Sequence, residues 1–313
     1  MNKYILGIDT SNYTTSAAVT SADGRIICDS RRLLTVKEGN RGLRQQDALF
    51  QHVNNMPEVL GRVFELVDGN DIGAVCVSTR PRNVEGSYMP CFNAGISQAR
   101  SIGCALGIPV FETSHQEGHL MAAMHGIHEL KDESFIFCHL SGGTCEILDY
   151  DMDSLKIIGG SLDISFGQLL DRTGVALGYG FPCGRMLDEI ATSTSGETSR
   201  LSTIKCREGK FNLSGIETQI MREIEKGENS PEFVREIFIK VTRCLAEAVT
   251  SLCTITGRDK VLLAGGVSSS MFLREHISEY AGDIDIYFGK KELCSDNAVG
   301  VSLIGGRKWQ QNL

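Results

Sequence analysis

Two histidines and one distant aspartate are the residues of this chain whose types and spacing most directly suggest chemistry. His115 and His119 lie in Thr113-Ser-His-Gln-Glu-Gly-His-Leu120, and Asp296 lies far downstream in Cys294-Ser-Asp-Asn-Ala298. Positions i and i+4 share one face of a helix, so both imidazoles can point at one ion. A carboxylate from a distant segment would complete three ligands and leave a coordination position open for a substrate. The sequence therefore predicts a metal centre.

The start of the histidine-bearing helix has its own signature. Ser114 can be its N-cap, and Glu117 falls at the third helical position, which makes a capping box. Glu117 is therefore expected to cap the helix and not to act as a base. The segment also lacks the H-E-x-x-H order of zinc proteases, so a metalloprotease is the least favoured interpretation.

Three turns rich in glycine and hydroxyl groups suggest a nucleotide beside the metal. They are Gly7-Ile-Asp-Thr-Ser-Asn12, His139-Leu-Ser-Gly-Gly-Thr144 and Ala264-Gly-Gly-Val-Ser268. Glycines let backbone N–H groups approach an anion, and the last turn also directs a helix N-terminus at its ligand. Each turn alone is typical of an ordinary tight turn. Their combined order, two between strands and one between a strand and a helix, resembles the ATP-binding fold of actin, sugar kinases and heat-shock chaperones.

Apolar periodicity predicts the elements that position these residues. Strands are expected at residues 4–10, 16–21, 25–34, 72–77, 109–112, 135–140, 145–150, 155–158, 261–263 and 284–288. Helices are expected at residues 47–67, 95–106, 167–177, 185–192, 231–256, 269–280 and 297–309, besides the one that carries the histidines. We expect an N-terminal lobe over residues 1–113 and a C-terminal lobe over 114–313. The histidine-bearing helix would lie at their junction, and residues 297–313 could pack back on the first lobe.

Length and composition limit the class of protein. The chain has 313 residues, 42% hydrophobic and 22% charged, which is ordinary for a globular protein. Its net charge of -8 argues against nucleic-acid binding by bulk charge alone. Lys37, Arg41, Arg44, Arg80 and Arg82 are candidates for a local basic patch, although a solvated face is the simpler interpretation.

The cysteines and the lengths of the apolar runs indicate the cellular compartment of the protein. The 11 cysteines are dispersed and form no C-x-x-C pair, so we expect free thiols in a reducing cytosol. The N-terminus enters a strand pattern directly, with no signal-peptide pattern before it. No apolar run reaches the roughly 18 residues expected of a membrane span. A cytoplasmic location is therefore expected.

The ordered motifs resemble the TsaD-like threonylcarbamoyl-transferase family of tRNA modification, formerly called O-sialoglycoprotein endopeptidases. Gly7-Ile-Asp-Thr-Ser11 resembles the family's G-I-E-T-S, and His115-Gln-Glu-Gly-His119 matches its H-x-E-G-H motif. Further similarity lies at Ser141-Gly-Gly143, Phe166–Leu177, Tyr179-Gly-Phe-Pro-Cys-Gly184, Asp188, Ala264-Gly-Gly-Val267 and Ser295-Asp-Asn297. This resemblance implies a two-lobed α/β fold of the actin and heat-shock-chaperone ATPase (ASKHA) class, with duplicated ribonuclease-H-like subdomains.

The resemblance also implies an activity and a site. The family moves a threonylcarbamoyl group from threonylcarbamoyl-AMP to N6 of adenosine 37 in tRNA, so tRNA and partner proteins of a threonylcarbamoylation complex are implied. His115, His119 and Asp296 would bind an iron, zinc or magnesium ion. An ATP- or AMP-type nucleotide, or the acyl-adenylate itself, would meet Asp9, Thr10, Ser11, Leu140, Ser141, Gly142, Gly143, Asp171, Gly184, Asp188, Gly265, Gly266 and Ser270.

The chain departs from the family pattern in ways that keep other functions open. Asn12-Tyr13-Thr14-Thr15 stands where the family has an acidic pair before a threonine. Substitutions also fall at Thr144, at Cys183, at Ser270 and over the segment 80–84. They indicate a divergent paralogue. Such a protein could use another acceptor, or serve as a non-catalytic nucleotide-binding partner in a tRNA-modification complex. The sequence predicts neither the native metal nor the oligomeric state.

Overall fold

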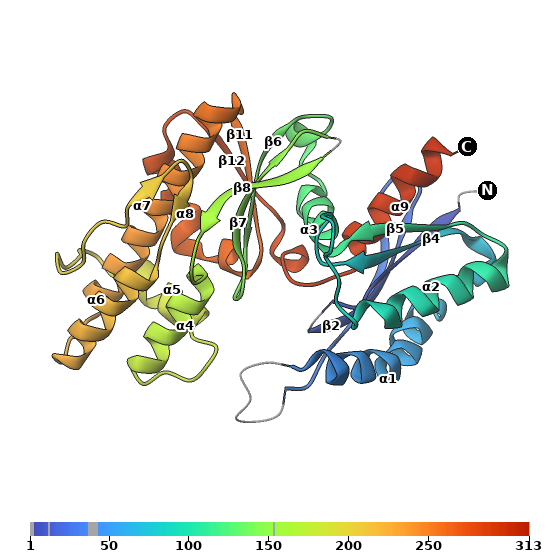
Figure 1. Ribbon diagram of the computed structural model, residues 1–313, viewed down its shortest axis with the longest axis horizontal. Coiled ribbons are helices and arrows are strands. Elements are labelled where there is room, and N and C mark those ends of the chain that lie inside the picture. The colour runs from blue at the N-terminus through green and yellow to red at the C-terminus, as the bar shows by residue number, and fades with distance from the viewer. Residues whose placement is uncertain (1–2, 12, 37–42, 153, 313) are drawn as a thin grey trace. The chain divides into compact units, whose positions relative to one another are not determined.

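The computed structural model describes residues 3–11, 13–36, 43–152 and 154–312. The chain divides into two compact units, one formed by residues 1–125 and 295–313 and the other by residues 126–294 (Figure 1). The predicted boundary fell after residue 113. The structure instead places the histidine-bearing helix in the first unit, because that helix packs against the C-terminal helix.

The first unit is built on a five-stranded sheet of order β3-β2-β1-β4-β5. Its strands are β1 (Tyr4–Asp9), β2 (Thr14–Ser21), β3 (Ile26–Leu33), β4 (Ile72–Arg80) and β5 (Val110–Ser114). Strands β1, β2 and β3 form an antiparallel meander, whereas β4 runs parallel to both β1 and β5. The carboxyl ends of β1, β4 and β5 therefore meet at one edge of the sheet, where ligands of open α/β sheets usually bind.

Helices cover both faces of this sheet (Figure 1). Helices α1 (Gln45–Phe64) and α2 (Phe92–Leu106) lie on one face, and α9 (Val299–Gln311) lies on the other. Helix α3 (His115–Met124) packs against α9. The strand period of two explains the arrangement: Leu6 and Ile8 join the core under α1, whereas Ile5 faces Gly305 of α9.

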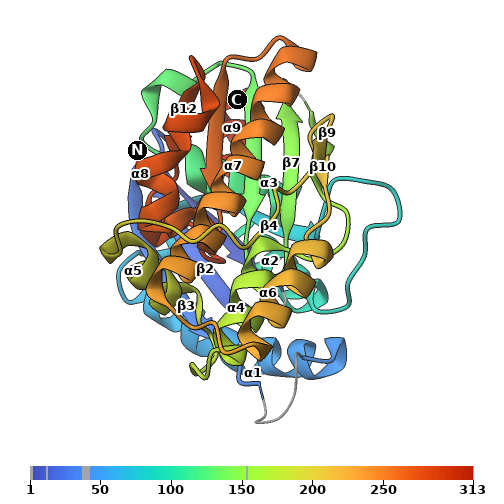
Figure 2. The ribbon, with the colours of Figure 1, turned by 90° about the vertical axis from the view of Figure 1, so that its left-hand side faces the viewer.

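The second unit contains a seven-stranded sheet of order β12-β11-β6-β7-β8-β10-β9. Its strands are β6 (Phe135–Leu140), β7 (Cys145–Tyr150), β8 (Leu155–Ser161), β9 (Cys206–Arg207), β10 (Lys210–Phe211), β11 (Lys260–Ala264) and β12 (Asp285–Phe288). Its helices are α4 (Phe166–Ala176), α5 (Gly184–Ser193), α6 (Ser214–Glu225), α7 (Pro231–Thr256) and α8 (Met271–Ala281). Figure 2 shows α7 in front of its strands. The sequence did not predict α6, β9 and β10.

Helix α7 is the central helix of this unit and matches its predicted range. Ser230 is its N-cap, Pro231 occupies the first turn, and the left-handed Gly257 ends it. Its apolar face, including Phe233, Leu245 and Val249, belongs to the core cluster that also contains the inward side chains of β6 and β11. Short 3-10 helices lie at Gly69–Asp71, His128–Leu130, Gly266–Ser269 and Lys291–Leu293.

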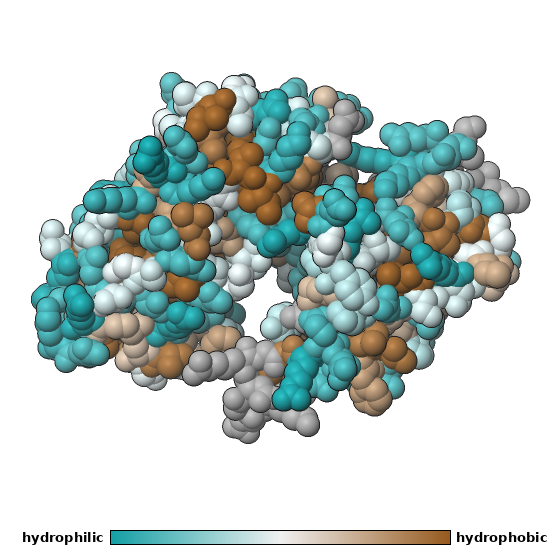
Figure 3. Space-filling model, viewed as in Figure 1, coloured by the Kyte–Doolittle hydropathy of each residue, from teal (hydrophilic) through white to brown (hydrophobic). Residues whose placement is uncertain are grey.

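The surface and the cysteines agree with an ordinary globular chain. The face in Figure 3 mixes hydrophilic and hydrophobic residues over both units. All 11 cysteines are free, as the sequence predicted. Among the described residues, no helix has the length and apolar character needed to cross a bilayer.

Candidate metal centre and candidate nucleotide pocket

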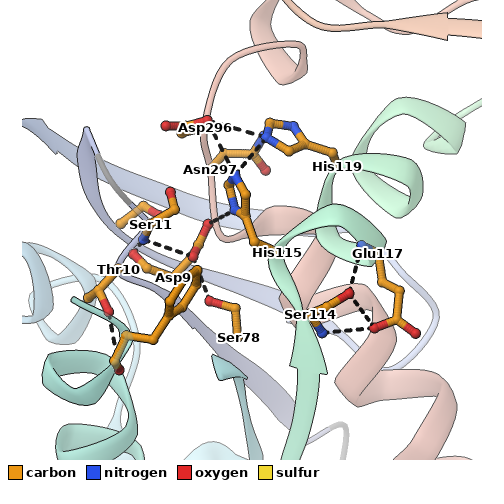
Figure 4. A network of polar contacts seen from close by, with 12 residues as sticks. Asp9, Thr10, Ser11, Ser78, Ser114, His115, Glu117, His119, Asp296 and Asn297 are labelled. Atoms are coloured by element: carbon orange, nitrogen blue, oxygen red, sulfur yellow. Dashed lines mark hydrogen bonds and ion pairs between the residues drawn. The ribbon is translucent and has the colours of Figure 1, made fainter. Parts of the chain in front are cut away.

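The first unit brings the three predicted metal ligands together (Figure 4). The Nε2 atoms of His115 and His119 lie 3.0 Å apart. Oδ1 of Asp296, from the segment before α9, lies 3.6 Å from Nε2 of His115 and 3.3 Å from Nε2 of His119. Ligand atoms about 2.0–2.2 Å from a tetrahedral ion would themselves be about 3.3–3.6 Å apart. The two distances to Asp296 fall in this range, whereas the 3.0 Å between the two imidazole nitrogens is shorter, so a bound ion would require the rings to move slightly apart.

Asp9 orients the first of these histidines. Its Oδ2 lies 2.6 Å from Nδ1 of His115, while its Oδ1 accepts hydrogen bonds from Oγ of Ser78 at 2.5 Å and from the Ser11 N–H at 3.1 Å. A carboxylate at Nδ1 keeps the proton on that nitrogen and leaves Nε2 for a metal. The sequence assigned Asp9 to substrate binding and missed Ser78. Strands β1 and β4 pair in parallel with Ile8 opposite Val77, and this register places Asp9 beside Ser78.

The charges around His115 alter its protonation. Burial disfavours the imidazolium form, but the negative charges of Asp9 and Asp296, together with the Asp9 hydrogen bond, raise the pKa of His115 to about 9. At neutral pH the metal-free ring is therefore protonated between two carboxylates. A metal ion must displace this proton when it binds.

The crossing of α3 and α9 fixes the distance between the ligands. A Cβ at Gly300 would overlap the carbonyl oxygen of Gly118 and lie 2.7 Å from the Ala122 backbone nitrogen. Only glycine at position 300 permits this approach of two helix backbones. Because Asp296 lies three residues before Val299, the first residue of α9, the crossing sets its side chain against the histidines of α3.

The predicted capping box at the start of α3 is present. The Ser114 hydroxyl accepts from the Glu117 N–H at 3.2 Å, and Oε2 of Glu117 accepts from the Ser114 N–H at 2.8 Å. The same Oε2 lies 3.0 Å from the Thr113 hydroxyl that donates to it. Glu117 is thus committed to the helix start, which argues against a protease-like general base.

Thr10 and Ser11, predicted to contact substrate, are buried supports of the first unit. The Thr10 hydroxyl accepts from the Gly95 N–H and donates to the Cys91 carbonyl oxygen, each at 3.1 Å, and so anchors the start of α2. Ser11 is 3% exposed and holds Asp9 through its N–H group. Three residues named in the sequence arguments, Asn12, Lys37 and Arg41, lie outside the described residues.

The second unit contains a pocket of about 580 Å³, a volume within the range of small-molecule sites. Six residues predicted from the sequence line it: Gly142, Asp171, Gly184, Asp188, Gly266 and Ser270. The structure adds apolar and cationic lining residues that the sequence did not indicate: Leu170, Phe238, Val267, Met271, Arg185 and Lys291. Helices α4, α5, α7 and α8 and the 3-10 helices Gly266–Ser269 and Lys291–Leu293 contribute them, so no local motif could reveal the set.

The remaining predicted residues of this unit shape the pocket's surroundings. Ser141 closes a turn by accepting from the Thr144 N–H at 3.0 Å. Gly265 has a φ of +96° and lies directly on the Leu140 backbone, where a Cβ would overlap the carbonyl oxygen. Gly143 belongs to the same turn as Ser141 but does not line the pocket.

Asp188 is bound to the start of α8. Its Oδ1 accepts from the Ser270 hydroxyl at 2.5 Å and from the Phe272 N–H at 3.1 Å, and its Oδ2 accepts from the Met271 N–H at 2.8 Å. The Leu273 N–H donates to the Ser270 hydroxyl. The sequence predicted that this helix N-terminus would be directed at the phosphate or the adenosine of a ligand. Its first N–H groups are instead satisfied within the protein.

Solved structures define the class of fold. The chain has a TM-score of 0.66 to the HypF protein of T. kodakarensis, at 13% identity, covering 99% of this chain and 48% of that one. It has a TM-score of 0.56 to the activator of 2-hydroxyisocaproyl-CoA dehydratase from Clostridium difficile, solved with bound ADPNP. The identity there is 15%, over 99% of this chain and 98% of that one. These likenesses confirm the actin and heat-shock-chaperone-like fold class expected from the sequence.

Sequence comparison then identifies the family. The family model of TsaD, described as tRNA N6-adenosine threonylcarbamoyltransferase, matches residues 34–302. The tRNA N6-adenosine threonylcarbamoyltransferase of Neorickettsia sennetsu is 27% identical, covering 96% of this chain and 92% of that protein. The chain belongs to the TsaD family, which is a family of acyltransferases.

Proposed function

We propose that this protein transfers a threonylcarbamoyl group from threonylcarbamoyl-AMP to N6 of adenosine 37 in tRNA. The observation that carries the proposal is the family match over residues 34–302, which contains both histidines of α3 and Asp296. These three side chains come from segments far apart in the sequence, yet their donor atoms lie within 4.8 Å of one another.

His115, His119 and Asp296 would hold the metal ion. Two imidazole nitrogens and one carboxylate oxygen suit zinc or iron better than magnesium, which prefers oxygen ligands and retained waters. When bound, the ion would polarise the carbamoyl end of the donor as a Lewis acid. Asp9 would keep the ring of His115 turned so that Nε2 faces the ion.

The pocket of the second unit would hold the AMP part of the donor. Leu170, Phe238 and Val267 offer apolar surface to an adenine ring. Asp171 uses Oδ1 to accept from the Cys183 N–H at 2.8 Å, and its Oδ2 would accept from a ribose hydroxyl. Lys291 is the stronger phosphate candidate, because the other cation of the lining, Arg185, is paired with Glu189.

The nucleophile in this reaction is the amine of the tRNA base, so the protein needs no nucleophile of its own. Cys183 lies next to the pocket residues Pro182 and Gly184, but burial raises the pKa of its thiol. A thiol held protonated in this way is a poor nucleophile. The work of the chain would be to orient the donor and to exclude water from it.

The direct test is to incubate the protein with zinc or iron, threonylcarbamoyl-AMP and unmodified tRNA, and to analyse the nucleosides. We expect threonylcarbamoyladenosine from the wild type and none from His119→Ala. The exposed His128, in the second unit, provides the matched control His128→Ala, which should retain activity. Absence of the modified base, with and without partner proteins of a threonylcarbamoylation complex, would refute the tRNA proposal.

One structural observation favours a second candidate, carbamoyl transfer to another acceptor. Tyr13 and Thr14 stand where the family has its acidic pair, and Thr14 is buried whereas Tyr13 is 43% exposed. Neither position therefore offers a carboxylate. Release of AMP from threonylcarbamoyl-AMP without tRNA, combined with an unmodified tRNA, would support this candidate. Failure of both zinc and ATP to raise the melting temperature would contradict both enzyme proposals.

A further inference from the structure

Two segments leave the carboxyl edge of the second unit's sheet side by side. Strands β11 and β12 pair in parallel with Leu263 opposite Phe288, so the segments that follow them emerge together. The segment after β11 forms the 3-10 helix Gly266–Ser269, and the segment after β12 leads to Lys291. Both segments line the candidate nucleotide pocket. The place of Lys291 in that pocket therefore depends on what joins the two segments.

Arg274 of α8 joins them. Its Nε donates to the carbonyl oxygen of Ser268 at 2.8 Å, and its Nη2 donates to the carbonyl oxygen of Gly289 at 3.0 Å. The same guanidinium lies over the ring of Phe288, 4.6 Å from the ring centroid. Ser268 belongs to the first segment and Gly289 begins the second. The rigid fork of a guanidinium suits this task, because two N–H groups on one edge reach two acceptors at once.

Cys294 contacts the same two segments more weakly. Its Sγ lies 3.7 Å from Oγ of Ser268 and 3.6 Å from the carbonyl oxygen of Gly289. A thiol is a weak donor and a weak acceptor. Hydrogen bonds from a charged group such as Arg274 are roughly twice as strong as neutral ones, so the guanidinium contributes more to holding these two pocket walls together.

The ammonium group of Lys291 is placed to bind an anion. Its Nζ lies 3.3 Å from Sδ of Met271, which also lines the pocket. A thioether carries no charge and is a weak acceptor, so this contact does not neutralise the ammonium. The lysine side chain is long and flexible, and its reach therefore depends on where its backbone is held. Lys291 lies two residues after Gly289, the residue that Arg274 binds.

We propose that Arg274 is a positioning residue of the nucleotide pocket: it holds the segments after β11 and β12 together and thereby places Lys291 at the phosphate of AMP. This inference rests on the proposed function, which assigns the AMP part of the donor to this pocket. Arg274 is not one of the residues that line the pocket. It acts through Ser268 and Gly289 and not by contact with the nucleotide.

Adenosine lacks the phosphate of AMP, so the ratio of the two affinities measures the contribution of the phosphate contact. In calorimetric titration of the full chain, we expect the wild type to bind AMP about tenfold more tightly than adenosine, as a charged hydrogen bond would give. Lys291→Met should abolish most of this preference. Arg274→Met should reduce it at least about threefold and leave the affinity for adenosine within about twofold of the wild type. A purely structural role of Arg274 would lower both affinities equally.

Arg274→Lys separates position from charge. Lysine keeps the positive charge, but a single ammonium group cannot reproduce the paired donation from Nε and Nη2. We therefore expect Arg274→Lys to lose the preference for AMP as Arg274→Met does. The double variant Arg274→Met/Lys291→Met should bind AMP within about twofold of Lys291→Met alone, because residues that act through one contact are not additive.

Arg243→Met is the matched control. Arg243 also places a guanidinium over an aromatic ring of α8, 4.9 Å from the centroid of Tyr280, but neither residue lines the pocket. This variant should leave both affinities unchanged. The melting temperature of each variant is measured first, and all titrations are made where every variant is folded. If Arg274→Met does not fold, Arg274→Lys provides the test.

The outcomes distinguish this inference from the proposed function. A wild-type preference for AMP in Arg274→Met or in Arg274→Lys would overturn the inference and leave the pocket standing. Equal losses of AMP and adenosine affinity, or an additive loss in the double variant, would also overturn it. Equal binding of AMP and adenosine by the wild type would exclude Lys291 from the phosphate and the inference with it. A wild type that binds neither ligand would overturn the pocket as well, whereas the tRNA assay tests the transferase activity separately.

Discussion

Asp9 ends β1 and is completely buried, and its carboxylate meets donors from three directions. A buried charge is stable only when it is paired and hydrogen-bonded. Ser78 and Ser11 satisfy one oxygen, and His115 pairs with the other. This carboxylate therefore controls both the orientation of the His115 imidazole and the proton on it.

The variant Asp9→Asn should bind Zn²⁺ about 10–100-fold more weakly, because a neutral amide cannot polarise and orient His115 as a carboxylate does. Calorimetric titration measures the change. Glu58→Gln, which removes a surface pairing with Arg62 on α1 in the same unit, is the control and should leave the affinity unchanged. An unaltered affinity in Asp9→Asn would show that Asp9 does not orient the ligand.

The affinity for zinc should depend on pH through His115. Its pKa is raised from 6.5 to about 9 in the metal-free protein, so below that pH a metal ion competes with one proton. The apparent affinity should rise about tenfold per pH unit between pH 7 and 9 and then level off. In Asp9→Asn the affinity should reach its plateau at a lower pH, because the charge of Asp9 no longer raises the pKa of His115. An affinity independent of pH over this interval would contradict the protonated state of His115.

At the scale of elements, the site depends on two helices that cross at glycines. Helix α3 carries the imidazoles, and α9 begins three residues after Asp296. The backbone contact between Gly118 and Gly300 is possible only without a Cβ at position 300. In the second unit, Asp188 of α5 similarly binds the start of α8 and joins two walls of the pocket.

The variant Gly300→Ala should destabilise the protein by about 1–3 kcal/mol, as expected for overpacking, and should weaken zinc binding by forcing α3 away from α9. Denaturant unfolding and zinc titration measure the two effects. Gly61→Ala on α1 is the matched control, since an added Cβ meets no atom within 4 Å there. That control should be neutral or stabilising by up to about 1 kcal/mol. Gly300→Ala with wild-type zinc affinity would refute the role of the crossing.

At the scale of the whole molecule, the two candidate sites lie in different units. The three metal ligands belong to the unit formed by residues 1–125 and 295–313, and the pocket lies within residues 126–294. Each ligand should therefore stabilise mainly the unit that binds it, because binding to the native state alone raises the free energy of local opening.

Hydrogen exchange measured by mass spectrometry can test this separation. Zinc should slow exchange in α3 and at the start of α9, whereas AMP should slow exchange in α4, α5 and α8. EDTA should reverse the first effect only. Protection of α3 by AMP equal to that by zinc, in the absence of any metal, would contradict the assignment of the two ligands to separate units.

Local patterns in the sequence predicted many of the helices, strands and helix caps. The capping box at Ser114, the limits of α7 and the strand meanders follow from neighbouring residues, so periodicity and cap chemistry were enough. Periodicity was less informative about burial: Phe50 and Val53 belong to the apolar spacing of α1, yet they are 69% and 53% exposed. The two-residue strands β9 and β10 were missed, because such short segments take their structure from packing. Helix α6 was missed although Ile216, Ile220 and Ile224 follow helical spacing in the sequence.

The sequence by itself determined the class of the protein: the order of its glycine turns, the histidine pair and the late aspartate indicated the fold and the family. Only the tertiary structure showed that Asp9 orients His115, that two glycines let α3 and α9 touch, and that Asp188 caps α8. Each of these depends on contacts between segments far apart in the chain. Such contacts are set by strand register and by helix packing, and neither can be predicted from a local pattern of residues.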